Sequence, residues 1–167
     1  RECHAEQFRS WKGSDHGLAE RGLDASLDGR AFASERAFSH GTQGTTIVAG
    51  EPFTVRTTGP DGKVGAFTPA RVIGNDPLRQ FLVAFPGGRY QTLEASYDPA
   101  RDEWFNVYGE EDRRPGEWGH WTGRGMNWNT MCASCHATQV RKNFDAATGV
   151  YKTTTFALGV GCQACHG

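Results

Sequence analysis

The chain has 167 residues, of which 37% are hydrophobic and 22 are glycine, and its formal net charge at pH 7 is −1. The length predicts one domain, and the low apolar fraction predicts a thin polypeptide core. The near-neutral charge gives no reason to expect a nucleic-acid partner. No apolar run is long enough to cross a bilayer and no signal peptide is present, so we interpret the sequence as mature or trimmed.

The first 44 residues begin with a helical pattern. Within residues 5–20, Phe8 and Trp11 fall three positions apart on one face, and Gly13 follows as a helix stop. A helix here would present His16 just beyond its end. Residues 21–40 are predicted to be mixed turn and helix.

From about residue 45 to residue 108 the pattern changes to short runs rich in β-branched and aromatic residues, separated by turn signals. The expected strands are Thr45–Val48, Phe53–Thr57, Val64–Ile73, Gln80–Phe85, Tyr90–Tyr97 and Trp104–Tyr108. They predict an antiparallel meander of five or six strands that contains no cysteine. Its role is either a folding scaffold or a spacer and docking face.

In the last part of the chain, a charged loop is expected over residues 109–120, a short helix over Asn127–Ala137 and a strand over Tyr151–Phe156.

This part contains two complete Cys-x-x-Cys-His motifs. They are Cys132-Ala-Ser-Cys135-His136 and Cys162-Gln-Ala-Cys165-His166. This pattern is the covalent attachment site of a c-type haem. Two thiols about one helical turn apart can reach the vinyl groups of one porphyrin, and the histidine then lies under the iron as its proximal ligand.

A remainder of the same pattern stands at the start, where Arg1-Glu2-Cys3-His4 reads x-x-Cys-His. It predicts a third haem, held by a single thioether. Five cysteines fit two complete motifs and one truncated motif. The expected cofactors are therefore three covalent haem c groups. Their attachment residues would be Cys3, Cys132, Cys135, Cys162 and Cys165, and their proximal iron ligands His4, His136 and His166.

Zinc and disulfides are the alternatives for these cysteines. Two Cys-x-x-Cys pairs also fit a four-cysteine zinc site. The histidines favour haem, because only 6 of 167 residues are histidine and yet one follows every cysteine site. A zinc ribbon needs no histidine after each pair. Disulfides within Cys-x-x-Cys pairs are usually redox-active rather than structural.

Three histidines remain, His16, His40 and His120, which equals the number of predicted haems. Each is interpreted as a distal iron ligand, against the alternative of a surface or hydrogen-bonded histidine. Met126 or Met131 could instead supply a sixth ligand, although Met131 also fits as core filler. Irons with two histidine ligands are six-coordinate and closed to substrate, so they transfer electrons and perform no bond chemistry.

Tryptophans flank His120, at Trp118, Trp121 and Trp128. Their indoles suit porphyrin packing and an ordinary core equally well. No nucleotide-binding glycine loop, nucleophile elbow or catalytic carboxylate pair stands out, so no catalytic residue is predicted.

Five stretches together resemble a known family. They are Cys3-His-Ala-Glu-Gln-Phe8 with Trp11 and His16, Phe85-Pro-Gly-Gly-Arg89, His120-Trp-Thr-Gly-Arg124, Asn127–His136 and Gly161–Gly167. They resemble the multihaem c-type cytochrome domain of secreted bacterial proteins, which often precedes tetratricopeptide repeats. They are more distantly similar to tetrahaem cytochromes of the hydroxylamine-oxidation type. The resemblance implies electron transfer and a distal ligand at His16, and the positions of His40 and His120 also recur in the family.

These patterns predict an α+β fold with much irregular structure. Short helices that carry haem sites would surround a central antiparallel β meander, and the core would be built on the haems. One trihaem domain would span residues 1–167, with a first haem segment (1–44), a β-rich insert (45–108) and a segment for the second and third haems (109–167).

The predicted function is an electron carrier that exchanges electrons with other redox proteins or with further copies of itself. Haems near both ends of the chain also suggest the subunit of an extracellular filament. The alternative is a periplasmic oxidoreductase in which one open iron acts on a small nitrogen or sulfur compound. Because haem c is attached outside the cytoplasmic membrane, the expected location is extracytoplasmic, at the cell surface or in the periplasm.

Overall fold

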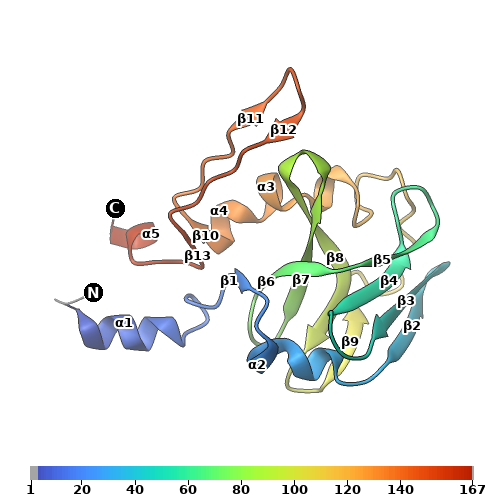
Figure 1. Cartoon of the computed structure of the whole chain (residues 1–167), viewed down its shortest axis with the longest axis horizontal. Helices are drawn as coiled ribbons and strands as arrows, with labels where there is room; N and C mark the ends of the chain where they lie inside the picture. The colour runs from blue at the N-terminus through green and yellow to red at the C-terminus, as the bar shows by residue number, and fades with distance from the viewer. Residues whose placement is uncertain (1–3, 167) are drawn as a thin grey trace.

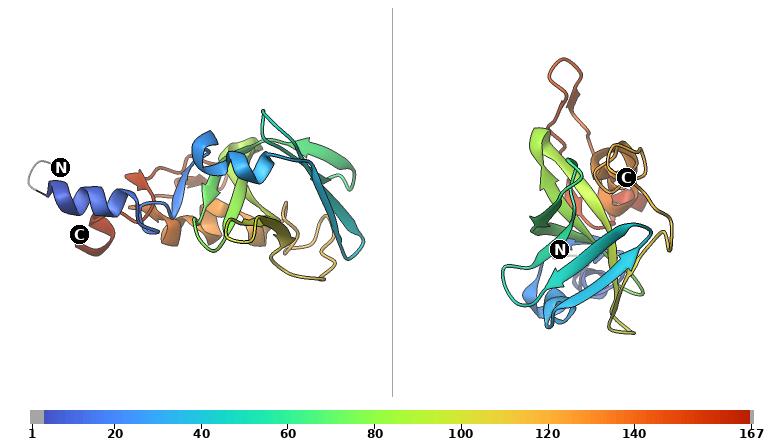
Figure 2. Two further views of the ribbon diagram at one scale, coloured as in Figure 1. Left: turned by 90° about the horizontal axis from the view of Figure 1, so that it is seen from below. Right: turned by 90° about the vertical axis from the view of Figure 1, so that its right-hand side faces the viewer.

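Two antiparallel β-sheets dominate the computed structural model, which describes residues 4–166 (Figures 1 and 2). Strands account for 37% of the structure and helices for 21%, so the chain is mainly β and the predicted α+β class is wrong. Apart from the first one, the helices are single turns that lie beside motifs and loops. Within the described part of the chain, no helix is both long and apolar enough to span a membrane.

The larger sheet has five strands in the order β1-β6-β7-β8-β9. Their bounds are Glu20–Gly22 (β1), Pro69–Ile73 (β6), Arg79–Phe85 (β7), Arg89–Asp98 (β8) and Glu103–Asn106 (β9). The second sheet has four strands in the order β2-β3-β4-β5. They are Arg36–His40 (β2), Gln43–Val48 (β3), Thr54–Thr58 (β4) and Val64–Phe67 (β5).

The helices and the remaining strands lie mostly outside these sheets. The α-helices are Ala5–Lys12 (α1), Ala25–Asp28 (α2), Trp128–Met131 (α3), Ala133–His136 (α4) and Gln163–His166 (α5). The 3-10 turns are Gly29–Phe32 (η1), Pro86–Gly88 (η2) and Arg124–Met126 (η3). Two short antiparallel pairs join Ala137–Thr138 (β10) to Ala157–Leu158 (β13) and Phe144–Asp145 (β11) to Val150–Tyr151 (β12).

The predicted strand over Val64–Ile73 is in fact two strands in different sheets. β5 pairs with β4, whereas β6 pairs with β7 and β1. The division falls at Thr68 and Pro69, and a proline has no N–H to continue the ladder of the previous strand. A meander expected as one sheet therefore becomes two sheets that pack face to face.

The core between the sheets consists of side chains of the polypeptide. The Phe32 ring stacks on Phe53 at 4.6 Å between centroids and meets Phe81 and Trp104 edge-on, each at 5.4 Å. The Trp104 indole N–H donates to the Ala31 carbonyl at 2.7 Å. The prediction of a core built on haems is wrong for this part, because apolar and aromatic side chains from both sheets already fill it.

The five-stranded sheet is buried on both faces. Phe81 and Val83 of β7 point into the core between the sheets, while Leu82 between them belongs to a second cluster on the opposite face. That alternation follows from the two-residue period of a strand. Trp128 and Ala133 of α3 and α4 cover the second face. The sheet therefore supports the first complete Cys-x-x-Cys-His motif, Cys132–His136.

Several local predictions are confirmed and others need adjustment. The first helix runs over Ala5–Lys12 and ends at Gly13, as its sequence predicts. The helix expected over Asn127–Ala137 is divided into α3 and α4 by a break at Cys132. The strand expected over Tyr151–Phe156 is a regular strand only at Val150–Tyr151, followed by an isolated bridge between Thr154 and Arg141.

We expect Phe32→Ala to lower the free energy of unfolding by about 3–5 kcal/mol, because it removes the ring at the centre of the core between the sheets. Phe32 is 1% exposed. Chemical denaturation followed by circular dichroism measures the change. Phe144→Ala is the matched control, since Phe144 is 50% exposed and its loss should change stability by less than about 1 kcal/mol. Equal effects of the two substitutions would contradict this description of the core.

Candidate haem-binding sites

The two complete motifs adopt the same backbone conformation, a single helical turn. In the first, the N–H of His136 donates to the Cys132 carbonyl at 3.1 Å. In the second, the N–H of His166 donates to the Cys162 carbonyl at 2.9 Å. This turn places the two thiols of each motif on one side of a helix, as attachment to one porphyrin requires. None of the four cysteines is in a disulfide, and all but Cys132 are exposed.

The ring of His136 is oriented by a hydrogen bond to the backbone. Its Nδ1 lies 3.0 Å from the carbonyl oxygen of Ala19. A carbonyl can only accept, so Nδ1 carries the proton and Nε2 keeps a free lone pair for a metal. The same carbonyl also accepts the N–H of Gly74 at 2.9 Å, which fixes its position at the end of β6. Iron-ligating histidines usually have their second nitrogen held in this way, so the residues present fit a haem at this motif.

Thr138 connects the first complete motif to the second. This residue follows His136 by two positions and is fully buried. Its hydroxyl donates to the Gly159 carbonyl and accepts the N–H of Gly161, both at 2.7 Å. Gly161 directly precedes Cys162. Together with the pairing of β10 and β13, these bonds fix the position of one motif relative to the other.

The turn that contains His16 lies against both motifs. The His16 carbonyl accepts the N–H of Val160 at 2.8 Å, and the Trp11 indole donates to the Val160 carbonyl at 2.7 Å. Gly159 has φ +80° and approaches this turn so closely that a Cβ would lie 2.7 Å from the Gly17 carbonyl. A side chain at that position would push the turn and the motif apart. The His16 side chain itself is exposed.

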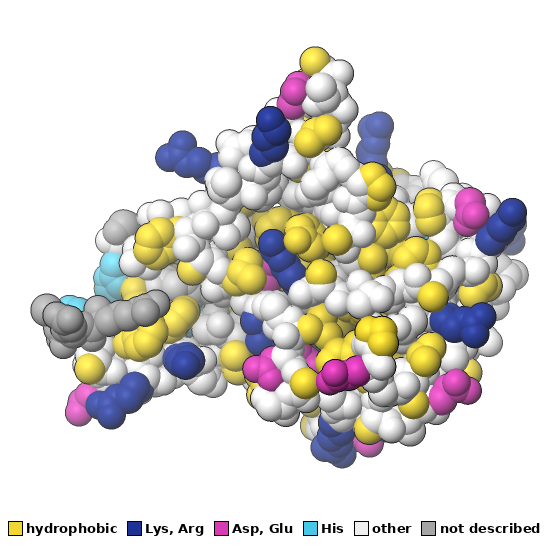
Figure 3. All heavy atoms as spheres, in the orientation of Figure 1, with side chains coloured by type: hydrophobic (Ala, Val, Ile, Leu, Met, Phe, Trp, Pro, Cys, Tyr) yellow, Lys and Arg dark blue, Asp and Glu magenta, His cyan; other side chains and the backbone are white. Residues whose placement is uncertain are grey.

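The segments that carry the three predicted haem sites gather at one end of the molecule. α1 and α5 lie side by side there in two views, and α4 lies between them and the sheets (Figures 1 and 2). The histidine side chains visible in Figure 3 lie at this same end. His4 is the N-cap residue of α1. Cys3, the predicted attachment residue of the first haem, lies outside the described residues.

A buried carboxylate lies beside the first complete motif. Glu20 accepts the Trp128 indole N–H at 3.0 Å and an Arg71 N–H at 3.1 Å. Its side chain is fully buried, and burial raises its pKa to about 6 although both partners oppose that rise. The Cys132 thiol has a raised pKa, chiefly through burial and in smaller part through the negative charge of Glu20.

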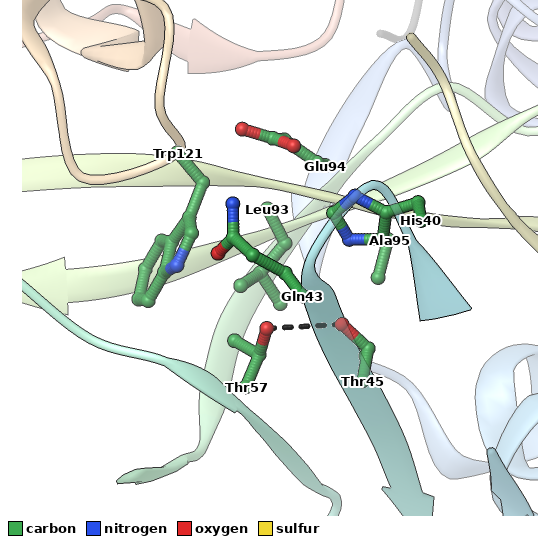
Figure 4. A pocket seen from close by; sticks show the side chains of 8 residues that line it. All are labelled: His40, Gln43, Thr45, Thr57, Leu93, Glu94, Ala95 and Trp121. Carbon is green, nitrogen blue, oxygen red and sulfur yellow. Dashed lines mark hydrogen bonds between the residues drawn. The ribbon is translucent and has the colours of Figure 1, made fainter. Parts of the chain in front are cut away.

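His40 and His120 are placed elsewhere, in the part of the molecule built from the two sheets. β2, which ends at His40, lies at the opposite end from α1 and α5 (Figure 1). His40 lines a cavity of about 10 Å³ together with Gln43 and Glu94, shown in Figure 4. That volume holds about one water molecule. His120 is 0% exposed, and its Nδ1 bonds to the Thr122 hydroxyl at 2.7 Å.

Burial lowers the pKa of both histidines, and each has one ring nitrogen without a hydrogen-bond partner. The pKa of His120 is lowered further, to a small extent, by the charge of His40. A porphyrin does not fit into the cavity beside His40. The assignment of these two histidines as distal ligands stays a prediction, and their surroundings do not support it.

The methionines and tryptophans that the sequence suggested as iron ligands or porphyrin contacts include both buried and exposed residues. Met126 is buried and its sulfur accepts the Tyr108 hydroxyl at 2.9 Å, whereas Met131 is exposed. Trp121 belongs to the core between the sheets, and Trp128 belongs to the cluster on the other face of the five-stranded sheet, with Ala133 of α4. Trp118 is exposed. Two of the three tryptophans are therefore ordinary core residues.

The zinc alternative requires both cysteine pairs in one cluster. Over residues 4–166, no three His, Cys, Asp or Glu side chains are close enough together to hold a metal ion. The two pairs are carried by separate helices, α4 and α5, so they do not form a single four-cysteine site.

Three residues of the site were missed by sequence reasoning: Ala19, Thr138 and Glu20. Ala19 contributes only its carbonyl, which leaves no trace in the sequence. Thr138 resembles any threonine near a strand. Glu20 gave no usable signal either, because charged residues are mostly exposed and its burial follows from the pairing of β1 with β6.

Comparison with known proteins agrees with this geometry at the C-terminal end of the chain. Residues 118–167 match the family described as "Cytochrome c554 and c-prime". This segment, called the cytochrome domain below, is therefore similar to a multihaem cytochrome c domain. The cytochrome domain contains both complete motifs, so the predicted resemblance to multihaem c-type cytochromes is confirmed for these residues, and covalent haem c is the cofactor it implies.

The fold as a whole is similar to a solved cytochrome, "Crystal Structure of Outer Cell Wall Cytochrome OcwA", with a TM-score of 0.53. The match covers 98% of this chain and 29% of that one, at 17% sequence identity. The chain therefore spans less than a third of the length of that cytochrome, and the likeness concerns the fold alone. Among curated proteins, no sequence matches.

Thr138→Val should destabilise the cytochrome domain by about 2 kcal/mol or more, because it removes the hydroxyl and leaves the Gly159 carbonyl and the Gly161 N–H unpaired. Urea denaturation measures the change in the free energy of unfolding. Thr68→Val, at an exposed position of the same residue type, is the control and should have an effect near zero. If Thr138→Val unfolds like the wild type, Thr138 does not hold the two motifs together.

Proposed function

We propose that this protein is a one-electron carrier that holds three covalent haem c groups, at its two complete motifs and at Cys3 and His4. The observation that supports this most directly is the hydrogen bond from His136 Nδ1 to the Ala19 carbonyl. It leaves Nε2 free in a fixed direction, beside two cysteines on one helical turn. A histidine that merely stabilised the fold would not need both features together.

The haem, when bound, supplies reversible one-electron chemistry at its iron. The chain's own residues hold and orient it. Cys132 and Cys135 attach it, the Ala19 carbonyl aims the imidazole of His136, and Thr138 fixes the distance to the next motif. Electron transfer weakens steeply with distance, so a carrier needs adjacent haems held at a constant separation. The hydrogen bonds of Thr138 serve that need.

His16 is the distal ligand that we propose for one of these haems. Its side chain is exposed, and its turn touches the segment before Cys162 as well as the residue that orients His136. Either haem of the cytochrome domain is therefore within the reach of this turn. His40 and His120 are not included in this ligand set, so in the proposed carrier the exposed Met131 or a side chain of a neighbouring copy would complete the other irons.

The end that carries α1 and α5 is the proposed place of electron exchange. A partner that docks there, another redox protein or a further copy of the chain, would approach all three haem segments at once. Contacts between copies through this end alone would form a closed pair, so the predicted filament needs a second, different contact surface as well. Electron microscopy of the purified protein can test for filaments. An extracytoplasmic location agrees with covalent haem and with the outer cell wall from which the structurally similar cytochrome takes its name.

An oxidoreductase with one open iron is the second candidate. It is favoured by one observation, the burial of His40 and His120 away from the motifs. If neither serves as a distal ligand, the histidines of this chain do not close every iron. An open position would bind a small nitrogen or sulfur compound, as the sequence-based alternative has it.

Haem counting tests the proposed carrier. The wild type should contain three haems per chain by pyridine haemochrome assay, and they should remain bound in acid–acetone because thioether bonds hold them. The double variants Cys132→Ala/Cys135→Ala and Cys162→Ala/Cys165→Ala should each lose one haem. The protein should be reduced by dithionite and reoxidised fully by a ferric complex. A colourless protein, or haem lost to acid–acetone, would end the proposal.

Carbon monoxide distinguishes the two candidates. A carrier whose irons are all six-coordinate should show no change in its reduced visible spectrum when carbon monoxide is added at neutral pH. His16→Ala should open one iron and create a carbon monoxide-sensitive band, whereas His120→Ala should not. Binding by the wild type would favour the oxidoreductase. A new band in His120→Ala would show that His120 is an iron ligand.

A further inference from the structure

We propose that Glu20 takes up a proton when the haem held by Cys132–His136 is reduced, an inference that rests on the proposed function. Glu20 would thus make electron transfer at this haem depend on proton binding. It touches no haem ligand directly, so its effect on the iron is electrostatic.

The position of Glu20 supports this coupling from two sides. Along the chain, Glu20 follows Ala19, whose carbonyl holds His136. In space, its carboxylate accepts the Trp128 indole N–H at 3.0 Å, and the Trp128 carbonyl in turn accepts the N–H of Cys132 at 3.1 Å. The charge of Glu20 already acts on the Cys132 sulfur, whose pKa it helps to raise. A change of charge at the neighbouring iron therefore acts back on Glu20.

The surroundings keep Glu20 ready to change its protonation state near neutral pH. Its carboxyl group is sealed from water, and burial raises its pKa to about 6. Arg71 is the charged group that faces it from β6, and it lowers this pKa without cancelling the effect of burial. Arg71 is itself partly exposed and stacks over the Tyr90 ring at 4.1 Å. The Arg71 side chain therefore connects the Glu20 carboxylate with the solvent-exposed surface.

The other groups around Glu20 do not compete for this role. From α3 the Trp128 indole is a neutral donor, and the Cys132 sulfur no longer titrates once it is a thioether. From β1 the neighbouring Arg21 is paired with Asp28 at 2.7 Å. The His136 ring has its Nδ1 occupied by the Ala19 carbonyl. Glu20 is thus the carboxylate placed to respond.

The coupled step would involve one electron and one proton. One electron from the donor protein would reduce the haem that Cys132, Cys135 and His136 would hold, and this would remove one positive charge beside the Glu20 carboxylate. The carboxylate then binds one proton from the solvent and becomes a neutral carboxylic acid. No covalent bond other than the new O–H is formed. Since reduction favours the protonated carboxyl group, the midpoint potential of this haem should fall as the pH rises through the pKa of Glu20.

Redox titration of the full haem-loaded protein at a series of pH values tests the proposal. In the wild type, we expect reduction to strengthen proton binding about tenfold, which corresponds to a fall of ~59 mV in the potential of one haem across a pH window that starts near pH 6. In Glu20→Gln, this dependence should disappear. Glu94→Gln is the matched control, because Glu94 is another buried carboxylate with a raised pKa but lines the cavity at His40. It should keep the wild-type dependence.

An infrared difference spectrum between oxidised and reduced wild type provides a second readout that needs no variant. With glutamate labelled by carbon-13, a protonated carboxyl band should appear on reduction just above pH 6. Its absence overturns the proposal, as does an unchanged pH dependence in Glu20→Gln. These results would leave the carrier function intact, since the haems would still be reduced. If no haem can be reduced, the proposed function itself is wrong.

Discussion

The hydrogen bond between His136 and the Ala19 carbonyl is the contact on which the haem-binding part depends. It determines which ring nitrogen is free to bind iron, and its acceptor is held in turn by the N–H of Gly74 at the end of β6. The direction of the imidazole is therefore transmitted from the edge of the five-stranded sheet. A displacement of β6 would therefore change the direction of the ring.

This dependence gives the β-rich part a definite role. Of the two roles left open by the sequence, scaffold or docking face, the packing favours the scaffold. One face of the five-stranded sheet forms the core with the second sheet, and the other face supports Trp128 and Ala133 of the haem segment. Because Phe81, Leu82 and Val83 alternate between these faces, a slip of one residue in β7 would disturb both layers together.

The sequence was most informative where chemistry requires fixed spacing. The Cys-x-x-Cys-His motifs predicted the attachment turns, and the strand pattern located most strands to within a few residues. It could not show that Val64–Ile73 crosses from one sheet to the other, because both halves have equally good strand composition. It also suggested His40 and His120 as ligands, because the number of remaining histidines equalled the number of predicted haems. Such a count does not show where the side chains lie in the fold. Backbone contacts, such as the Ala19 carbonyl, have no sequence signature.

The two complete motifs differ in their solvent exposure, and this difference would affect the direction of electron flow between their haems. Cys132 and His136 are half-buried against the sheet, whereas Cys162, Cys165 and His166 are exposed. Burial disfavours the more highly charged ferric iron and so raises the potential at the first of these motifs, while an ionised Glu20 nearby lowers it. Of these two opposing influences only the second changes with pH. In the proposed carrier, the protonation of Glu20 would therefore shift the potential of the first haem relative to that of the second, and the exposed motif would be the more accessible point of contact for a partner.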